Sequence, residues 1–233
     1  MELRIRKQLQ NDRDLELSKY TNVPVEIIRT YSLKTIENVQ MGPENEDNMT
    51  IEEQLIELYR TYKYTSFDAH LRTMMFTSSR KRPDSLLKLA RESNHILNFG
   101  SGCGTHTIYA NEHGNHVTDL DVQGKMTEFA EWRLNLRGHN NYERVPHTFD
   151  LPSNKYDGVI CVAVLEHLMN PLAAFKRILK SMKPNGKICL LVSKIIKPTA
   201  GHFSFSINQW MKEGIPYLNK TCKFLGDSLY IKR

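Results

Sequence analysis

One stretch of the sequence constrains the fold of this chain more than any other: the apolar residues 95–99, which run directly into three alternating glycines. Gly100, Gly102 and Gly104 let the backbone turn sharply, and they let a ligand lie against the main chain because no Cβ atom is in its way. The following residues, 105–112, have the pattern of a helix. A strand, a glycine loop and a helix in this order predict the start of an open α/β sheet that binds a ligand at the loop.

The rest of the chain repeats this alternation of short apolar runs and helical segments. Strands are expected over residues 95–99, 116–120, 157–162 and 187–193, and helices over residues 105–112, 124–137 and 171–182. Repeated units of this length imply a parallel sheet with helices on both faces. The tail differs, because a helix expected over 206–213 is followed by two apolar runs, 222–225 and 228–232, that flank the turn residues Gly226-Asp227. The sheet is therefore expected to end in an antiparallel strand pair.

The chain before residue 81 lacks this alternation. Residues 1–45 show only short helical patches, and Gly42-Pro43 interrupts them. Thr50 and Glu53 fit a capping box, and apolar residues follow at helical spacing, which predicts a helix over 46–62. We therefore divide the chain into an N-terminal arm and helical cap, residues 1–80, and an α/β domain, residues 81–233.

Composition places the chain among ordinary globular proteins. Of its 233 residues 40% are hydrophobic and 25% charged, which is enough apolar material for a real core. The longest apolar runs are shorter than the roughly 20 residues that a membrane-spanning helix needs, and no apolar block with a cleavage site follows the N-terminus. We expect a cytoplasmic protein without membrane contact. The cysteines show no paired spacing, so neither a disulfide framework nor a zinc site is expected; they are Cys103, Cys161, Cys189 and Cys222.

The formal net charge of +6 is unevenly distributed along the chain. From Pro171 onward, 12 Lys and Arg residues face only Glu213 and Asp227, whereas the first 170 residues carry 20 basic and 24 acidic side chains. Such asymmetry can indicate an anionic partner such as nucleic acid. We favour the alternative that these lysines only form a solvent-exposed surface, because they are spaced along amphipathic elements rather than gathered in one run.

Asp121 is the second landmark, seventeen residues after Gly104 and at the tip of the next expected strand. A carboxylate at this place can accept hydrogen bonds from both ribose hydroxyls of a nucleoside that lies across the switch point of the sheet. Dinucleotide-binding folds use the spacing G-x-G-x-x-G. This chain has G-x-G-x-G instead, which disfavours NAD.

At this point the sequence resembles a known family, because residues 95–193 look like a class I S-adenosylmethionine-dependent methyltransferase of the small-molecule type. Five landmarks carry the resemblance. Residues 98–104 resemble the family's first motif, and Asp121 resembles its ribose-binding acid. Further along the chain, 149–152 with 156–160 resemble the third motif and fourth strand, 164–168 the segment after that strand, and 179–187 the turn into the fifth strand. The resemblance implies a Rossmann-like, doubly wound, mostly parallel seven-stranded sheet. It also implies S-adenosylmethionine as cofactor, with S-adenosylhomocysteine as product.

The resemblance further implies a set of cofactor-binding residues. They are Asn98, Gly100, Ser101, Gly102, Gly104, Asp121, Val122, Asp150, Leu151 and Val162. Asn98 departs from the family, which usually has Asp or Glu there, so the contact near the methionine moiety is neutral in this chain. The acid that meets the adenine amino group is either Asp150 or a position nearer His147.

Methyl transfer from a sulfonium to a nucleophile needs positioning more than chemical groups, because the cofactor carries the activated methyl group. Glu166 and His167 follow the fourth strand at the carboxyl edge of the sheet, where open α/β folds place their sites. His167 is our candidate proton acceptor, and the structural alternative is that both residues only shape the start of the next helix. The candidate acceptor-lining residues are Tyr62, Tyr64 and His202.

Two absent motifs narrow the function. Some similar methyltransferases bind a metal through ExxEH, but Ala163 replaces the first of these ligands, so no metal is predicted. The Asn/Asp-Pro-Pro-Tyr motif of enzymes that methylate base amino groups is also missing, since residues 161–164 read Cys-Val-Ala-Val. We therefore expect a methyltransferase with a small-molecule acceptor at O, N or C. The alternatives are an RNA or protein methyltransferase that uses the basic C-terminal third, and a non-catalytic cofactor-binding partner subunit.

Overall fold

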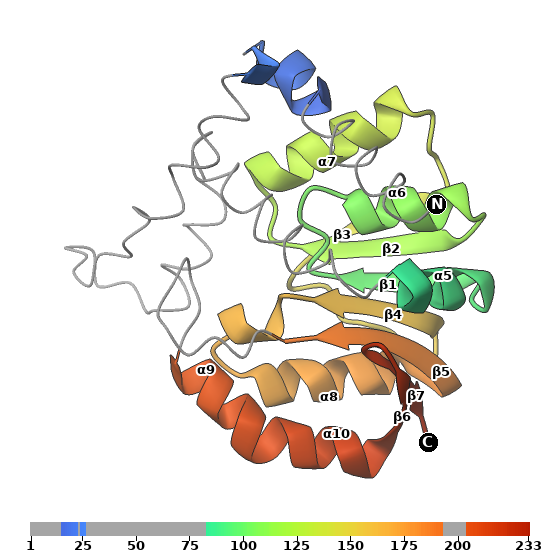
Figure 1. The fold of residues 1–233 in the computed structure, drawn as a ribbon, viewed down its shortest axis with the longest axis vertical. Helices are drawn as coiled ribbons and strands as arrows, with labels where there is room; N and C mark the ends of the chain where they lie inside the picture. Colours follow the sequence, from blue (N-terminus) through green and yellow to red (C-terminus); the bar gives the residue numbers. More distant parts are fainter. Residues whose placement is uncertain (1–14, 23, 27–82, 193–203) are drawn as a thin grey trace, which may run out of the picture.

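A seven-stranded sheet lies at the centre of the computed structural model, which describes residues 15–22, 24–26, 83–192 and 204–233 (Figure 1). The strands are β1 (His95–Phe99), β2 (His116–Asp121), β3 (Tyr142–Pro146), β4 (Tyr156–Val162), β5 (Met182–Leu191), β6 (Cys222–Gly226) and β7 (Leu229–Lys232). Their order is β3-β2-β1-β4-β5-β7-β6. Strands β1 to β5 are parallel, and β7 pairs antiparallel with β5 and β6. This confirms the mostly parallel sheet with an antiparallel C-terminal pair.

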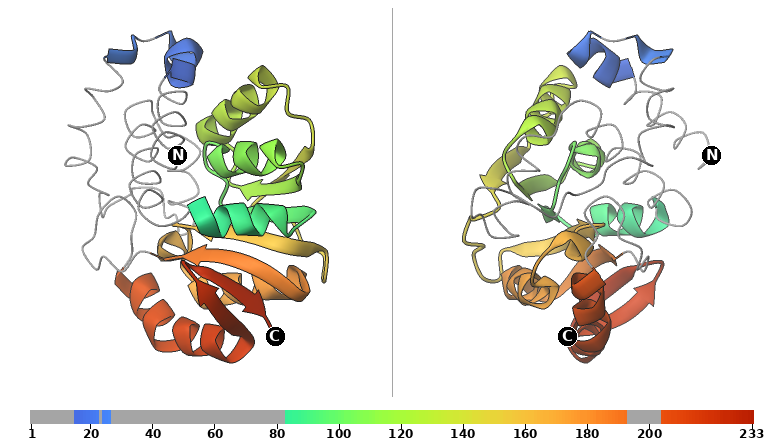
Figure 2. Two further views of the ribbon diagram at one scale, coloured as in Figure 1. Left: turned by 45° about the vertical axis from the view of Figure 1, so that its right-hand side comes forward. Right: turned by 90° about the vertical axis from the view of Figure 1, so that its left-hand side faces the viewer.

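Helices cover both faces of the sheet (Figure 2). They are α5 (Pro83–Arg91), α6 (Thr105–Glu112), α7 (Lys125–Leu136), α8 (Pro171–Ser181), α9 (Ser204–Gln209) and α10 (Ile215–Thr221), with a 3-10 turn η2 (Leu165–His167) and a π-helical segment η3 (Trp210–Gly214). One apolar cluster joins α5 and α6 to the sheet, and another joins α8, η3 and α10 to its opposite face. The doubly wound arrangement expected from the sequence is therefore present.

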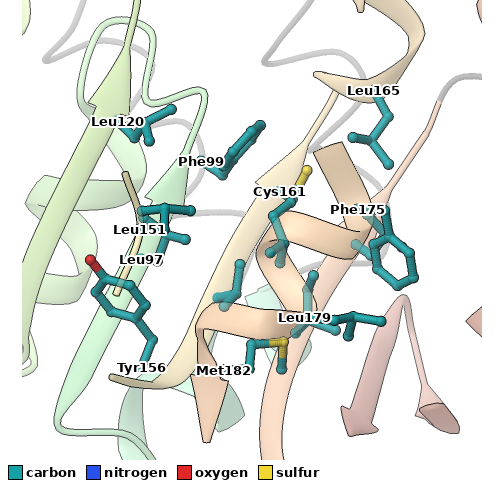
Figure 3. Packing of buried hydrophobic residues seen from close by; sticks show 14 of the residues in the cluster. Leu97, Phe99, Leu120, Leu151, Tyr156, Cys161, Leu165, Phe175, Leu179 and Met182 are labelled. Carbon is teal, nitrogen blue, oxygen red and sulfur yellow. The ribbon is translucent and has the colours of Figure 1, made fainter. Parts of the chain in front are cut away.

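The side chains of β1 show how the two apolar clusters divide between the faces. Leu97 and Phe99 belong to the cluster that contains Phe175 of α8 (Figure 3). Ile96 points the other way and packs in the cluster that contains Leu89 of α5. Successive side chains of a strand alternate between faces, so a strand that is buried on both faces is mostly apolar. Such runs are what the sequence pattern identified.

The residue pattern did not indicate strand β3. Its sequence, Tyr-Glu-Arg-Val-Pro, buries only Val145. The strand lies at the edge of the sheet and pairs only with β2, from Val117 to Asp121. An edge strand with one covered side does not need the apolar run that marks a central strand, which is why the periodicity missed it.

The helix expected over residues 206–213 is longer in the structure, because α9, η3 and α10 follow one another from Ser204 to Thr221. The Ile215 amide donates to the Trp210 carbonyl, five residues back. This wide turn directly precedes Pro216, which lacks an amide donor and whose ring would crowd a regular helical turn. A Cβ on Gly214 would lie 2.1 Å from a ring atom of Trp210, so the glycine serves close packing here rather than ending the helix.

Most of the N-terminal arm lies outside the described residues, including the helix expected over 46–62. Residues 15–21 are helical, and Leu17 is fully buried in a cluster that includes Phe129 of α7. In the described part of the chain, no helix has the length and apolar character needed to cross a membrane.

Candidate active site

The glycine loop joins β1 to α6 at the carboxyl edge of the sheet, where β1 lies between β2 and β4. Gly100, Gly102 and Gly104 have φ angles of 78°, 53° and 75°, a left-handed backbone that other residues adopt at a cost. A Cβ on Gly100 would lie 2.3 Å from a methyl group of Val164, and one on Gly104 would lie 3.0 Å from the Cβ of Ala130. Glycine is therefore required by backbone conformation and by close packing.

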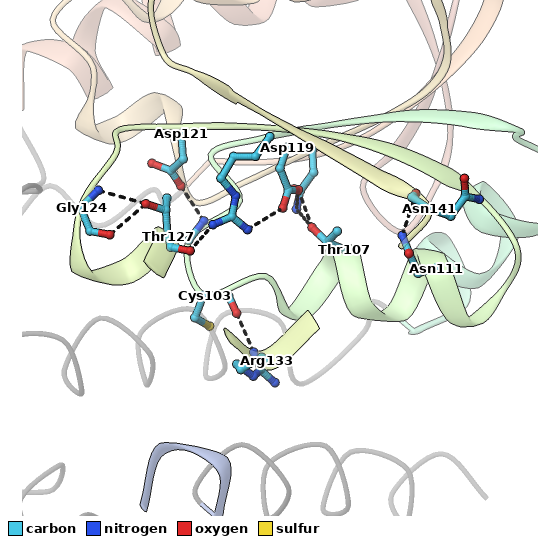
Figure 4. Close-up of polar contacts among 12 residues, drawn as sticks. Cys103, Thr107, Asn111, Asp119, Asp121, Gly124, Thr127, Arg133 and Asn141 are labelled. Atoms are coloured by element: carbon cyan, nitrogen blue, oxygen red, sulfur yellow. Dashed lines mark hydrogen bonds and ion pairs between the residues drawn. The ribbon is translucent and has the colours of Figure 1, made fainter. Parts of the chain in front are cut away.

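Asp121 fixes the glycine loop to the end of β2. Its Oδ2 accepts a hydrogen bond from the Gly102 amide at 2.5 Å, and its Oδ1 accepts one from the Val122 amide at 2.7 Å (Figure 4). Burial raises the pKa of the Asp121 carboxyl, while these two amide hydrogen bonds favour its charged form. Each carboxylate oxygen has a second acceptor position, so the group can hold the loop and still accept two hydroxyl donors.

Asn98 takes part in a polar network behind the loop. Its amide nitrogen donates to Thr107 Oγ1 at 3.0 Å and to Asp119 Oδ1 at 3.3 Å. The Thr107 hydroxyl donates to the same carboxylate (Figure 4), and Arg144 approaches its other oxygen at 3.6 Å. The neutral residue at position 98 therefore stands next to an acid on the neighbouring strand, since Asn98 and Asp119 are partners in the β1–β2 register.

Asp119 is a buried acid that the sequence analysis did not single out. It has no exposed surface, and burial raises its pKa to about 6, against the opposing influence of Thr107, Arg144 and Asn98. Its position two residues before Asp121, on the same face of β2, was the available signal. A charged residue at an inward position of a buried strand needs partners, and those partners come from β1, β3 and α6.

Two buried polar atoms beside the loop fit a polar ligand. Ser101 Oγ and Asn98 Oδ1 are shielded from solvent and have no hydrogen-bond partner in the described ranges. A buried polar group without a partner is costly, and a bound molecule with polar groups would remove that cost. These two atoms therefore suit a ligand with polar groups of its own, such as the methionine part of S-adenosylmethionine.

The loop after β3 carries two of the candidate cofactor-binding residues. Leu151 is buried in the apolar core, whereas Asp150 is exposed. Arg177 of α8 holds this loop by donating to the carbonyl oxygens of His147, at 3.1 Å, and Phe149. Burial lowers the pKa of Arg177, and the nearby Asp150 carboxylate opposes that shift. The pattern of the sequence gave no sign of this arginine.

The turn after β4 brings the candidate catalytic residues to the same edge of the sheet. Val162 is buried at the end of the strand, and Ala163 follows with φ of 55°. The 3-10 turn then places Glu166 with no exposed surface and His167 with 6% exposed. Glu166 lies close enough to Cys161 to contribute to the raised pKa of that thiol, after the larger effect of burial.

The structure thus brings the candidate cofactor residues to the carboxyl ends of β1, β2 and β4 and to the loop after β3. Tyr62, Tyr64 and His202 lie outside the described residues. Within the described ranges, no group of three or more His, Cys, Asp or Glu side chains is arranged to hold a metal ion.

Known protein families indicate the class of enzyme to which this domain belongs. Residues 97–190 match the family model described as a methyltransferase domain. This range begins in β1 and ends in β5, so it contains all five parallel strands and the glycine loop. No curated protein matches the chain.

Solved structures with a similar fold include a methyltransferase of Aquifex aeolicus that depends on S-adenosylmethionine, with 18% identity, a TM-score of 0.49, and coverage of 65% of this chain and 87% of that one. The phosphoethanolamine N-methyltransferase 2 of Haemonchus contortus has 18% identity, a TM-score of 0.47 and coverage of 60% and 35%. The 1,6-didemethyltoxoflavin-N1-methyltransferase of Burkholderia thailandensis has 22% identity, a TM-score of 0.46 and coverage of 62% and 65%. The chain thus spans less than two thirds of the second and third of these proteins.

The family match makes residues 97–190 a methyltransferase domain, and the strand order with the glycine loop after β1 is that of the class I S-adenosylmethionine-dependent type. This is an enzyme domain of the methyl-transferring class, and S-adenosylmethionine is its cofactor. The family and the cofactor expected from the sequence are confirmed.

The raised pKa of Asp119 predicts a pH dependence of stability. The folded-state value of about 6 lies above the reference value of 3.8, so the folded protein binds this proton more tightly. The stability linked to the proton is present below the unfolded pKa and is lost as pH rises through the folded one. Between pH 4 and 6.5 the loss amounts to about 2 kcal/mol in the free energy of unfolding.

Urea unfolding of the wild type and of Asp119→Asn at both pH values measures this contribution. Asp119→Asn should lack this pH-dependent contribution, so the difference in unfolding free energy between the wild type and the variant should change with pH. Asp150→Asn, at an exposed carboxylate on the same edge of the sheet, controls for loss of a surface charge. Identical pH dependence in the wild type and Asp119→Asn would contradict the assignment.

Proposed function

We propose that this protein transfers the methyl group of S-adenosylmethionine to a small-molecule acceptor at an oxygen, nitrogen or carbon atom. The reaction takes place at the carboxyl edge of the sheet, between the glycine loop and the turn after β4. The proposal extends the established class of the domain by one step, from the methyl donor to the kind of acceptor.

The contacts that basic residues near the C-terminus make within the protein support this proposal. Lys183 and Lys187 form ion pairs with Asp157 and Glu92, at 3.1 and 3.0 Å. Lys232 donates to two carbonyl oxygens at the C-terminal end of α8, at 2.8 and 2.7 Å. Lys183 and Lys187 precede the apolar residues 188–191 of β5, toward the end of the strand away from the glycine loop. These three lysines are engaged by partners within the protein and away from the site, so they are not offered to the phosphates of a nucleic-acid substrate.

The cofactor would be held by residues from four segments. These are Asn98, Gly100, Ser101, Gly102 and Gly104 of the first strand and loop, Asp121 and Val122 after β2, Asp150 and Leu151 after β3, and Val162 of β4. When bound, S-adenosylmethionine supplies a methyl group that its sulfonium has activated. In this assignment Asp121 accepts the ribose hydroxyls, and Asp150 or a group near His147 meets the adenine amino group.

Asp121→Ala tests the ribose assignment. The substitution removes hydrogen bonds to a charged group, so the affinity for S-adenosylhomocysteine measured by calorimetry should fall by about 1.5–3 kcal/mol. Glu128→Ala removes the same charge from an exposed position on α7 and should keep wild-type affinity. NADH should bind to neither protein, and unchanged affinity in folded Asp121→Ala would refute the assignment.

His167 is the proposed proton acceptor for an acceptor group that must lose a proton. An imidazole suits this task because its ordinary pKa is near neutrality. Of the two candidates on the turn, only His167 has exposed surface, while Glu166 has none. We therefore assign the proton transfer to His167 and a supporting position in the turn to Glu166.

The acceptor pocket would be completed by an N-terminal cap. In this proposal residues 1–80 form an arm and helical cap over the domain of residues 81–233, and Tyr62, Tyr64 and His202 line the acceptor. The helix at residues 15–21 supports it, because Leu17 shares a buried cluster with Cys103 of the glycine loop. Segments that cover a reacting centre exclude water from it.

Incubation of the full chain with labelled methyl donor and fractionated cell extract tests the acceptor class. Label in the small-molecule fraction is the expected outcome. Label in RNA or protein would overturn the small-molecule assignment and favour the corresponding macromolecular acceptor. Cofactor binding without any transfer in complete extract would favour the third function, a non-catalytic cofactor-binding subunit.

Once an acceptor is found, His167→Ala should lower kcat by about 100-fold and leave the affinity for S-adenosylhomocysteine unchanged. His167→Gln keeps hydrogen bonding but cannot take up the proton, so it should be equally slow. His113→Ala, in the exposed turn between α6 and β2, is the matched control. Parallel loss of cofactor affinity and thermal stability in both His167 variants would instead show a purely structural role.

A further inference from the structure

Arg133 of α7 is a buried arginine that contacts both the N-terminal helix and the glycine loop. Its side chain is 1% exposed. Its Nε donates to Glu16 Oε2 at 2.8 Å, and its Nη1 donates to the Cys103 carbonyl at 2.7 Å and to Thr105 Oγ1 at 2.9 Å. Figure 4 shows Arg133 directly below Cys103, joined by the hydrogen bond to its carbonyl.

Glu16 is the N-terminal end of this chain of contacts. It is 7% exposed, and its second oxygen accepts a hydrogen bond from Arg137 Nε at 2.7 Å. Arg137 is 21% exposed and also approaches Glu112 at the end of α6. A buried carboxylate is stable only when it is paired and hydrogen-bonded, so Glu16 depends on Arg133 of α7 and on Arg137, which directly follows α7.

Apolar packing brings the same two segments together. Leu17 and the Cys103 side chain belong to one buried cluster with Met126 and Phe129 of α7. The ring of Tyr20 lies 5.1 Å from that of Phe129, measured between centroids. The N-terminal helix therefore rests on the part of α7 that also supports the glycine loop.

The glycine loop is held at two neighbouring points. Asp121 binds the amide of Gly102, and Arg133 binds the carbonyl of Cys103. Glycines on either side of this carbonyl leave the loop with many accessible conformations, so contacts of this kind select one of them. Selecting the ligand-binding conformation before the ligand arrives increases affinity, because less ordering remains to be done on binding.

We infer that Arg133 is a positioning residue for the cofactor, and that the contacts from Glu16 through Arg133 to the Cys103 carbonyl couple docking of residues 15–22 to the shape of the glycine loop. The guanidinium is a planar group with donors in fixed directions, so the position of Glu16 determines where Nη1 points. Coupling of this kind is reciprocal: bound cofactor stabilises the docked helix, and the docked helix strengthens cofactor binding. The inference rests on the cofactor assignment made above.

Calorimetry with S-adenosylhomocysteine tests the coupling in the full chain. Glu16→Gln keeps the size of the side chain but removes the charge that orients the Arg133 guanidinium toward the Cys103 carbonyl, and it should raise the Kd by about tenfold. Arg133→Lys keeps the positive charge but loses the planar set of guanidinium donors, and it should raise the Kd by at least as much as Glu16→Gln does. Arg137→Met also removes a partner of Glu16 but not the contact with Cys103, and it should change the Kd by less than about threefold.

The double variant Glu16→Gln with Arg133→Lys should be no weaker than Arg133→Lys alone, because both changes break one chain of contacts. Hydrogen exchange gives a second readout: in the wild type the amides of residues 15–22 should exchange more slowly with S-adenosylhomocysteine bound, and Arg133→Lys should abolish that difference. A thermal melt without ligand separates these effects from lost stability.

Three results would overturn the inference. The first is a wild-type Kd in folded Glu16→Gln and Arg133→Lys. The second is a loss of affinity in Arg137→Met as large as in those two variants. The third is hydrogen exchange of residues 15–22 at the same rate with and without S-adenosylhomocysteine. If Arg133→Lys fails to fold, Glu16→Gln carries the same test. A wild-type chain that does not bind S-adenosylhomocysteine would overturn the cofactor assignment itself, which is a distinguishable failure.

Discussion

The hydrogen bond between the Asp121 carboxylate and the Gly102 amide, 2.5 Å long, is the contact on which the rest of the site depends. It joins the end of β2 to the glycine loop, whose left-handed backbone only glycine adopts without cost. The loop in turn leaves room for Val164 against Gly100, which fixes how closely the turn after β4 approaches. Three separate segments of the chain meet at one edge of the sheet because of these contacts.

Two buried acids lie near this edge, and each is matched by partners from other elements. Asp119 is held by Thr107, Asn98 and Arg144, and Glu16 is held by Arg133 of α7 and by Arg137 just after it. Removing a charge from water costs several kcal/mol unless partners compensate. Such groups therefore add little net stability, but they allow few alternative arrangements. In this protein they connect the strands that carry the cofactor loop with the helices behind it.

Much of the fold followed from local pattern, and the exceptions have physical reasons. The central strands were identified because strands buried on both faces are mostly apolar. Strand β3 was missed because it lies at the edge and buries only Val145. The helix that contains Gly214 and Pro216 was expected to end too early, since a π-helical turn and the Trp210 ring make these residues compatible with it. Neither effect is visible without the packed neighbours.

The sequence by itself determined the class of the domain, the glycine loop and the acid after β2, because these depend on residue types at short, fixed spacings along the chain. Only the tertiary structure showed that Asn98 faces Asp119 across a strand pair, that Glu166 is buried beside Cys161, and that Arg133 connects Glu16 to the loop. Glu16 and Arg133 are 117 residues apart. Contacts between such distant residues are set by how the helices pack on the sheet, and no local pattern encodes them.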